Sequence, residues 1–153
     1  MRSKQSAGIL LYRRSNTILE VFLVHPGGPF WKNKDAGAWT IPKGEFTNDE
    51  PALEAAVREF REETGVALKG PFQPLSPIQQ IGGKLVYAWA TPGDLDPSAL
   101  VSNTFELEWP PGAGRRQTFP EVDRGAWFNL PAAREYINPG QIPLLQELED
   151  SAL

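Results

Sequence analysis

The chain has 153 residues, of which 41% are hydrophobic and 22% are charged, and its formal net charge is −4. These values are typical of one globular domain with a hydrophobic core, and no apolar run approaches the roughly 18–20 residues that span a bilayer. The chain has no cysteine, which excludes disulfide bonds and thiolate metal sites. The N-terminal residues show no signal-peptide cleavage pattern, so we expect a single cytoplasmic domain over residues 1–153 that does not enter a membrane.

Acidic residues are concentrated between positions 45 and 63, where seven carboxylates accompany two arginines. A surface of this kind repels polyanions unless a cation intervenes, which argues against a long nucleic acid as a partner. The patch is therefore either a solvated surface or a site that holds metal.

The N-terminal part of the chain is expected to form a hairpin, a loop and a short strand. Residues 7–12 and 18–24 are apolar and rich in β-forming residues, and the polar segment 13–16 between them predicts a turn. The Pro- and Gly-rich segment 25–29 predicts a loop. A strand at 39–41 is expected to stop before a proline.

A helix is expected at 50–63, with Pro51 in its first turn and Gly65 at its C-terminal end. At 100° per residue its side chains separate into three groups. The apolar group is Leu53, Ala56, Val57 and Phe60, the neighbouring acidic group is Glu59, Glu62 and Glu63, and the opposite flank carries Glu54, Arg58 and Arg61. Three like charges at i, i+3 and i+4 repel one another, but carboxylate oxygens are the ligands that Mg²⁺ and Mn²⁺ prefer.

The C-terminal part is expected to alternate strands and helices around an irregular segment, 91–120, which is rich in Pro, Gly and Asp. Asn129 is the candidate cap of the first helix that follows this segment. The mixture of strands and helices predicts an α/β domain with a mixed sheet. The expected elements are a strand at 82–90 with part of a hairpin near Ile78, strands at 105–109 and 126–128, a flexible stretch at 110–116, and helices at 131–137 and 142–148.

Residues 44–66 match one known pattern at every position. Gly44, Glu50, Arg58-Glu59, Phe60, Glu62-Glu63 and Gly65-Val66 have the order and spacing of the Nudix box. The chain therefore resembles the Nudix hydrolases. The resemblance implies an α/β/α sandwich in which the box forms a loop–helix–loop, and metal-dependent hydrolysis of a nucleoside diphosphate linked to another moiety.

The resemblance also implies roles for individual residues of the box. Glu59, Glu62 and Glu63 are the implied ligands of Mg²⁺ or Mn²⁺, and Glu59 or Glu62 is the implied base that deprotonates water. Arg58 is implied to orient a metal-binding glutamate. The implied structural residues are Glu50, which pairs with that arginine, and Gly44 and Gly65 at the two loops.

Weaker similarities lie outside the box. Residues 6–14, 20–24 and 39–44 look like the N-terminal half of diadenosine tetraphosphate hydrolases. Residues 119–123, followed by Trp127-Phe128, resemble those enzymes and the RNA 5′-pyrophosphohydrolases, in which a glutamate at this place is a further metal ligand. Glu121 matches that glutamate by position, and a surface acid is the alternative.

Other residues are candidates for substrate binding. Lys43 precedes the box glycine, and Arg115 and Arg116 lie in a Pro/Gly-flanked segment suited to gripping phosphates, with solvated cations as the alternative. Aromatic rings stack on nucleobases but more often pack in a core. Tyr12, Phe30, Trp31 and Trp109 flank loops and are stacking candidates, Trp39, Trp89 and Trp127 are expected in the core, and the single histidine, His25, is expected to be structural or incidental.

The favoured function is hydrolysis of a dinucleoside polyphosphate or a nucleoside triphosphate. The alternatives are a 5′-triphosphate RNA pyrophosphohydrolase and a non-catalytic, nucleotide-sensing Nudix domain. Relatives in the family often dimerise, so a homodimer is an open alternative to a monomer.

Overall fold

The computed structural model describes residues 4–80 and 82–151, and a mixed β-sheet forms its centre. The strands run in the order β4-β6-β1-β2-β9, while β3 pairs with β1 and β5 pairs with β6. Strands β1 and β6 are parallel and all other pairs are antiparallel. The strands of this sheet are β1 Gln5–Ser15, β2 Ile18–Pro26, β3 Lys43–Glu45, β4 Gln73–Pro74, β5 Ile78–Gln79, β6 Leu85–Pro92 and β9 Val122–Asn129.

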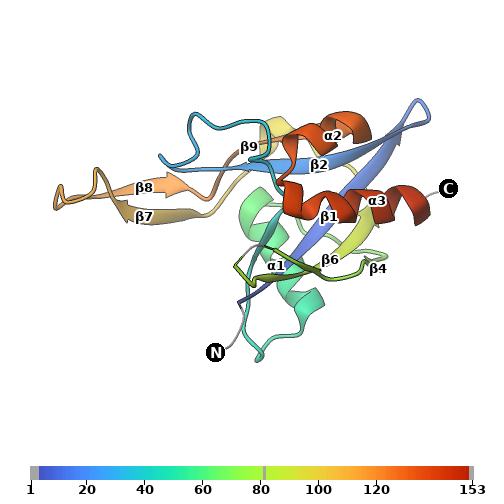
Figure 1. Cartoon of the computed structure of the whole chain (residues 1–153), viewed down its shortest axis with the longest axis horizontal. Coiled ribbons are helices and arrows are strands. Elements are labelled where there is room, and N and C mark those ends of the chain that lie inside the picture. The colour runs from blue at the N-terminus through green and yellow to red at the C-terminus, as the bar shows by residue number, and fades with distance from the viewer. Residues whose placement is uncertain (1–3, 81, 152–153) are drawn as a thin grey trace.

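Helices cover both faces of the sheet, so that the layers are α/β/α (Figure 1). Alternate residues of β1 point to opposite faces, as a strand requires. Leu10 packs toward α2 and α3, whereas Ile9 and Leu11 pack toward α1. The helical elements are α1 Ala52–Thr64, α2 Leu130–Tyr136 and α3 Ile142–Ser151, with the short 3₁₀ turns η1 Pro97–Ala99 and η2 Pro139–Gln141. No helix in the described part of the chain is long and apolar enough to cross a membrane.

A second, two-stranded sheet projects from this body. Strands β7 Thr104–Glu108 and β8 Arg116–Pro120 form an antiparallel hairpin that extends to the left in Figure 1. We call residues 104–120 the arm. The sequence predicted only its first strand and a flexible stretch at 110–116. Strand β8 was missed because its only apolar ring, Phe119, lies next to Pro120, and the strand has no alternating pattern.

The expected strand at 39–41 is wrong. Trp39 and Thr40 form only isolated bridges, and the strand at this place is β3, which pairs with β1. The close approach depends on Gly8, since a Cβ at Gly8 would lie 2.6 Å from the Cβ of Lys43 and 2.6 Å from the carbonyl oxygen of Pro42. A glycine on the neighbouring strand thus allows pairing to continue past Pro42.

Two details of the expected box helix also need correction. The helix starts at Ala52, and Pro51 is its cap in an extended conformation, with φ of −60° and ψ of 141°. Its buried side chains are Ala55, Ala56, Glu59, Phe60, Glu63 and Thr64, whereas Leu53 and Val57 are only partly buried. The helix is therefore rotated relative to the expected apolar face, and two glutamates face the body of the protein. Gly65 ends the helix at φ of 84°, as expected for a left-handed cap.

Candidate active site

Four carboxylates from two distant segments meet near the C-terminal end of α1. Glu59, Glu62 and Glu63 come from the helix, and Glu121 comes from the link between β8 and β9. Burial and the charges of neighbouring carboxylates raise the pKa of Glu59 and the pKa of Glu121, and each is affected by the charge of Glu62. The cluster therefore concentrates negative charge in a place where water shields it poorly.

Glu63 is the most perturbed member of the cluster. Only 9% of the surface of Glu63 is exposed, and burial together with the charge of Glu59 raises the pKa of Glu63 to about 8. The backbone N–H of Lys43 donates a hydrogen bond to its carboxylate, which partly offsets this effect. Without a cation at the cluster, Glu63 thus holds a proton at neutral pH.

Arg58 joins three glutamates of the box. Its Nε and Nη2 donate to the two carboxylate oxygens of Glu50 at 2.8 and 2.9 Å, a bidentate pair. Its Nη1 donates to Glu59 at 2.8 Å and to Glu62 at 3.1 and 3.2 Å. The expected position of Arg58 on the flank opposite these glutamates is therefore wrong, because residues four apart on a helix are neighbours.

Gly44 brings the backbone of β3 against the helix. A Cβ at this position would overlap the carboxylate of Glu59. Glycine is thus required for close approach rather than for an unusual dihedral angle, because its φ is not in the left-handed region. The loop before the helix holds Glu59 in place from one side, and Arg58 holds it from the other.

Two lysines lie next to the buried glutamate. Lys43 belongs to β3, and Lys84 follows the Gly82-Gly83 turn before β6. Burial and the nearby charge of Lys84 lower the pKa of Lys43 to about 8, although Glu63 acts in the opposite direction. Two ammonium groups held together beside the acidic cluster are suited to binding a phosphate. Sequence reasoning found Lys43 but missed Lys84, whose only signal was the glycine pair that precedes it.

The backbone of Glu121 is held between the arm and the loop that follows β2. Its N–H donates to the carbonyl of Asn103 at 2.8 Å, and its carbonyl accepts from the N–H of Gly27 at 2.9 Å. A Cβ at Gly27 would overlap the carbonyl oxygen of Pro120. Asn103 in turn donates its N–H to the carbonyl of Glu62 at 2.7 Å. The segment 101–103 therefore links the end of the box helix to Glu121, a connection that no spacing in the sequence indicated.

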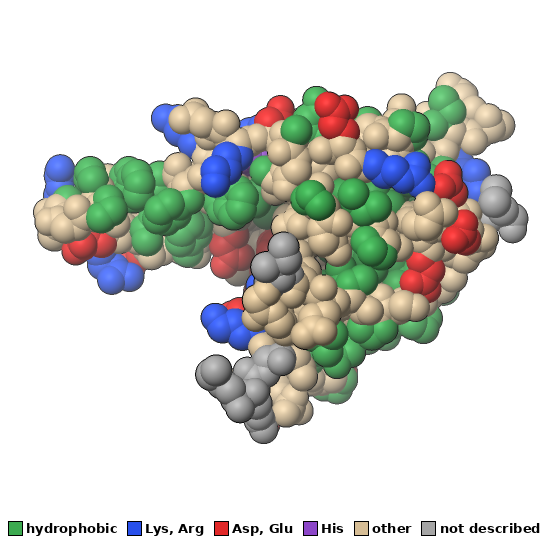
Figure 2. Space-filling model, viewed as in Figure 1, with side chains coloured by type: hydrophobic (Ala, Val, Ile, Leu, Met, Phe, Trp, Pro, Cys, Tyr) green, Lys and Arg blue, Asp and Glu red, His purple; other side chains and the backbone are tan. Residues whose placement is uncertain are grey.

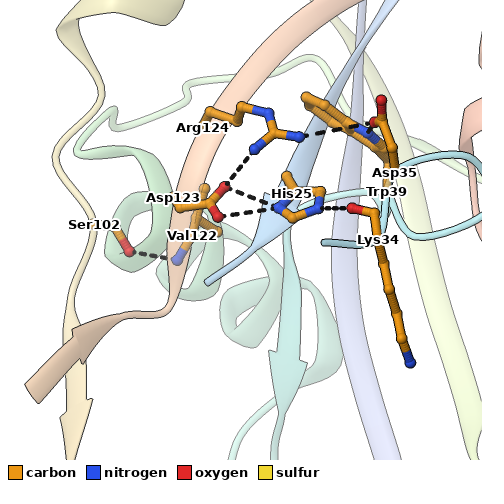
Figure 3. A network of polar contacts seen from close by, with 8 residues as sticks. All are labelled: His25, Lys34, Asp35, Trp39, Ser102, Val122, Asp123 and Arg124. Carbon is orange, nitrogen blue, oxygen red and sulfur yellow. Dashed lines mark hydrogen bonds and ion pairs between the residues drawn. The ribbon is translucent and has the colours of Figure 1, made fainter. Parts of the chain in front are cut away.

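His25, in β2, contacts both Asp123 at the start of β9 and the loop that follows β2 (Figure 3). Its ring is completely buried, with Nδ1 at 2.9 and 3.1 Å from the carboxylate oxygens of Asp123 and Nε2 at 2.6 Å from the carbonyl oxygen of Lys34. Asp123 also pairs with Arg124 at 3.6 Å. Lys34 lies in the loop after β2 and Asp123 lies two residues after Glu121, so that His25 has a structural role in joining the two segments.

The remaining predicted residues lie in separate places. Tyr12, a candidate for stacking on a nucleobase, is partly buried against the core on the α2 and α3 face of the sheet, on the other side from α1. Arg115 and Arg116 lie at the outer end of the arm, where Arg116 is 3.7 Å from Glu106. Trp39 is buried as expected, while Trp89 and Trp127 pack at the edge of the α1-side core.

The carboxylates fit a hard divalent cation by their chemistry. Within 4–80 and 82–151, no three acidic, histidine or cysteine side chains are close enough together to form a ready metal site. Arg58 occupies oxygens of Glu59 and Glu62 in this arrangement. The donors are all oxygens, and their mutual repulsion is the kind of charge that a divalent cation relieves.

Comparison with known proteins identifies the family. A family model described as NUDIX domain matches residues 2–148. The chain belongs to the NUDIX family. Nudix hydrolases generally use divalent metal ions. An RNA pyrophosphohydrolase of Erythrobacter litoralis (strain HTCC2594) is 34% identical over 67 residues, which are 44% of this chain and 37% of that protein.

Solved structures share this Nudix fold. The NUDIX domain of Shewanella oneidensis NrtR, complexed with ADP ribose, has a TM-score of 0.69 and 15% identity over 100% of this chain and 90% of that chain. A C. elegans Ap4A hydrolase in a binary complex has a TM-score of 0.66 and 20% identity over 96% of this chain and 97% of that chain. At these identities the likeness establishes the fold, and substrates have to be inferred from this chain's own residues.

Proposed function

We propose that this Nudix protein hydrolyses a pyrophosphate bond in a nucleotide with the help of Mg²⁺ or Mn²⁺. A dinucleoside polyphosphate or a nucleoside triphosphate is the favoured substrate. The observation that carries the proposal is the cluster of Glu59, Glu63 and Glu121, whose pKa values are all raised by burial and by neighbouring carboxylates. Such a cluster opposes stability without a cation, and groups with perturbed pKa values are concentrated at functional sites.

Glu59, Glu62, Glu63 and Glu121 are the proposed metal ligands. A bound divalent cation supplies charge neutralisation at the phosphate oxygens and lowers the pKa of a bound water. Arg58 keeps Glu59 and Glu62 from turning away by donating to both, and Glu50 anchors the guanidinium. Either Glu59 or Glu62 accepts the proton of the attacking water, since both are on the helix face beside Glu121.

Lys43 is the proposed contact for a substrate phosphate. It lies beside Glu63 and Lys84, so a phosphate held there is next to the carboxylates. The anion offsets the effect of Lys84 and favours the charged form of Lys43. Arg115 and Arg116 are proposed to meet more distant parts of the substrate from the arm.

The direct test is hydrolysis of a substrate panel with Mg²⁺ and with Mn²⁺. The panel contains diadenosine tetraphosphate, several nucleoside triphosphates, ADP-ribose and a 5′-triphosphorylated RNA. We expect metal-dependent turnover that Glu62→Gln lowers at least about a hundredfold, because the substitution removes a charged ligand or base. Glu54→Gln is the matched control, since Glu54 is exposed on the outer surface of the same helix.

The panel also separates the alternatives. Preference for the RNA would assign the chain to the activity named for the Erythrobacter protein. Binding of a nucleotide without turnover of any substrate would contradict catalysis and indicate a sensing domain. Calorimetric titration with ADP-ribose and diadenosine tetraphosphate provides the binding measurement for that outcome.

A further inference from the structure

The arm has one aromatic face and one polar face. Side chains directly opposite in an antiparallel pair share a face. Phe105 is opposite Phe119, with ring centroids 5.9 Å apart, and Leu107 lies on the same face as these rings. The N–H of Trp109 donates to the carbonyl of Arg115 at 3.1 Å, so that the pairing continues to the tip with a tryptophan and an arginine. The polar face carries Glu106, Thr118, Glu108 and Arg116.

The loop after β2 adds a second aromatic wall. The ring of Phe30 meets the ring of Trp109 edge to face, with centroids 5.2 Å apart, and a Cβ at Gly28 would lie 2.9 Å from the ring of Phe105. Phe30 nevertheless remains 59% exposed and Trp31 37% exposed. Two large rings that are ordered by neighbours but open to solvent form a surface suited to stacking.

Cationic residues lie next to two of these rings. Lys32 and Lys34 follow Phe30 in the loop, with the Nζ of Lys34 5.1 Å from the centre of the Trp31 ring, and Arg115 is exposed beside Trp109. The nearby acids are on the other face of the arm, where Glu106 pairs with Arg116 and Glu108 accepts from the N–H of Gly112. The aromatic face therefore combines π surfaces with positive charge, which matches a nucleoside that carries phosphate.

The root of the arm adjoins the acidic cluster. Asn103, at the root of the arm, hydrogen-bonds to the backbones of both Glu62 and Glu121. At about 3.3 Å per residue along a strand, Phe105 is roughly 7 Å and Trp109 roughly 20 Å from that root. Figure 2 shows hydrophobic side chains along the arm and acidic side chains in the hollow below its root, on one face of the molecule.

We propose that Trp109 and Phe30 bind a second nucleobase of the substrate, at the end far from the carboxylates. The occupant is the distal nucleoside of a dinucleoside polyphosphate, because a chain of phosphates spans the distance between the acidic cluster and the tip. A nucleoside triphosphate has no second nucleoside to place there. This inference rests on the proposed function of the carboxylate site and assigns the arm a role in choosing among its substrates.

The test compares kcat/KM for diadenosine tetraphosphate and for ATP in Trp109→Ala and Phe30→Ala. Loss of one stacking ring weakens binding of a base roughly five- to hundredfold. We expect kcat/KM to fall by this factor with diadenosine tetraphosphate and to change less than about threefold with ATP. Trp109→Phe keeps an aromatic ring and should retain most of the kcat/KM for diadenosine tetraphosphate. Ile18→Ala is the control, since Ile18 is also an exposed hydrophobic residue, 53% exposed, but it is the first residue of β2, and the β1–β2 turn lies on the side of the molecule opposite the arm (Figure 1).

Three outcomes would overturn the inference: equal losses with both nucleotides, no loss with either, or a selective loss only with 5′-triphosphorylated RNA. Phe30→Ala guards against a folding defect in the tryptophan variant, because the exposed Phe30 ring contributes little to the core. If the wild type hydrolyses none of these substrates, the proposed catalysis fails separately. Calorimetric titrations with diadenosine tetraphosphate and with AMP then test the role of the arm. That role requires Trp109→Ala to bind diadenosine tetraphosphate more weakly than the wild type does and to bind AMP as the wild type does.

Discussion

The hydrogen-bonded pair of His25 and Asp123 is expected to stabilise the whole region around Glu121. Both ring nitrogens of His25 face acceptors, the carboxylate of Asp123 and the carbonyl of Lys34. The ring thus joins two segments of the chain, and the side chain of Asp123 is 30% exposed.

The size of the effect follows from this burial. Removal of the buried His25 ring leaves the carboxylate of Asp123 and the carbonyl of Lys34 without this partner, and a buried acceptor that loses its partner costs about 1–3 kcal/mol, so that we expect His25→Ala to cost about 3 kcal/mol. An unfolding entropy of about 2.1 cal/mol/K per residue converts this loss into a fall in Tm of about 10 °C for a chain of this length. Scanning calorimetry of wild type and variant measures the shift.

A double-mutant cycle separates the pair from the loss of the ring itself. Asp123→Asn keeps the shape of the side chain and an oxygen that accepts from Nδ1, but it removes the charge. We expect a coupling free energy of about 1.5–3 kcal/mol between His25→Ala and Asp123→Asn, as for hydrogen bonds to a charged group. Arg124→Gln is the control, because Arg124 also pairs with Asp123. A coupling below about 0.5 kcal/mol would refute the hydrogen-bonded pair and leave only packing.

Three further predictions concern the box. Gly44→Ala should lower kcat about tenfold to a hundredfold with little change in Tm, because the new Cβ displaces the Glu59 carboxylate, and steady-state kinetics with calorimetry measures both. Arg58→Lys should lower kcat about tenfold, since lysine cannot form the bidentate pair with Glu50. Adding Glu50→Gln to Arg58→Lys should lower kcat little further, because the pair is already lost. In EDTA, the free energy of unfolding measured with urea should fall between about pH 5 and pH 8. The folded protein keeps the Glu63 proton up to its raised pKa of about 8, whereas the unfolded chain releases that proton near the ordinary pKa of a glutamate. Glu63→Gln should flatten this pH dependence.

The sequence was sufficient for the parts of the structure that rest on local patterns. The box helix, the two N-terminal strands and the Asn129 cap, whose side chain accepts from the N–H of Ala132, were all predicted within a few residues. The family and the α/β/α layers followed from the complete box and are confirmed by the NUDIX match. Each of these features depends on residues close together in the chain, where periodicity and capping preferences act.

The features that the sequence did not predict all depend on distant contacts. Lys84 reaches Lys43 only because β6 and β3 both pair with β1. Tyr12 has the flanking-loop position of a ligand-binding ring, but the alternation of β1 directs it to the α2 and α3 face. Strand β8 has no apolar alternation, and it forms because β7 pairs with it along its whole length. Local patterns carry no information on these contacts.

The rotation of the box helix is the most informative difference between expectation and structure. A helix arranged for stability would bury Leu53 and Val57 and leave its glutamates in water, since burial of a carboxylate opposes its ionisation. This helix instead buries Glu59 and Glu63 and leaves the two apolar side chains partly exposed. Arg58 alone cannot neutralise the cluster, because it is already paired with Glu50, Glu59 and Glu62 while the pKa of Glu63 stays raised to about 8. The folded chain thus retains an acidic site at a cost in stability, a cost that a bound divalent cation would remove.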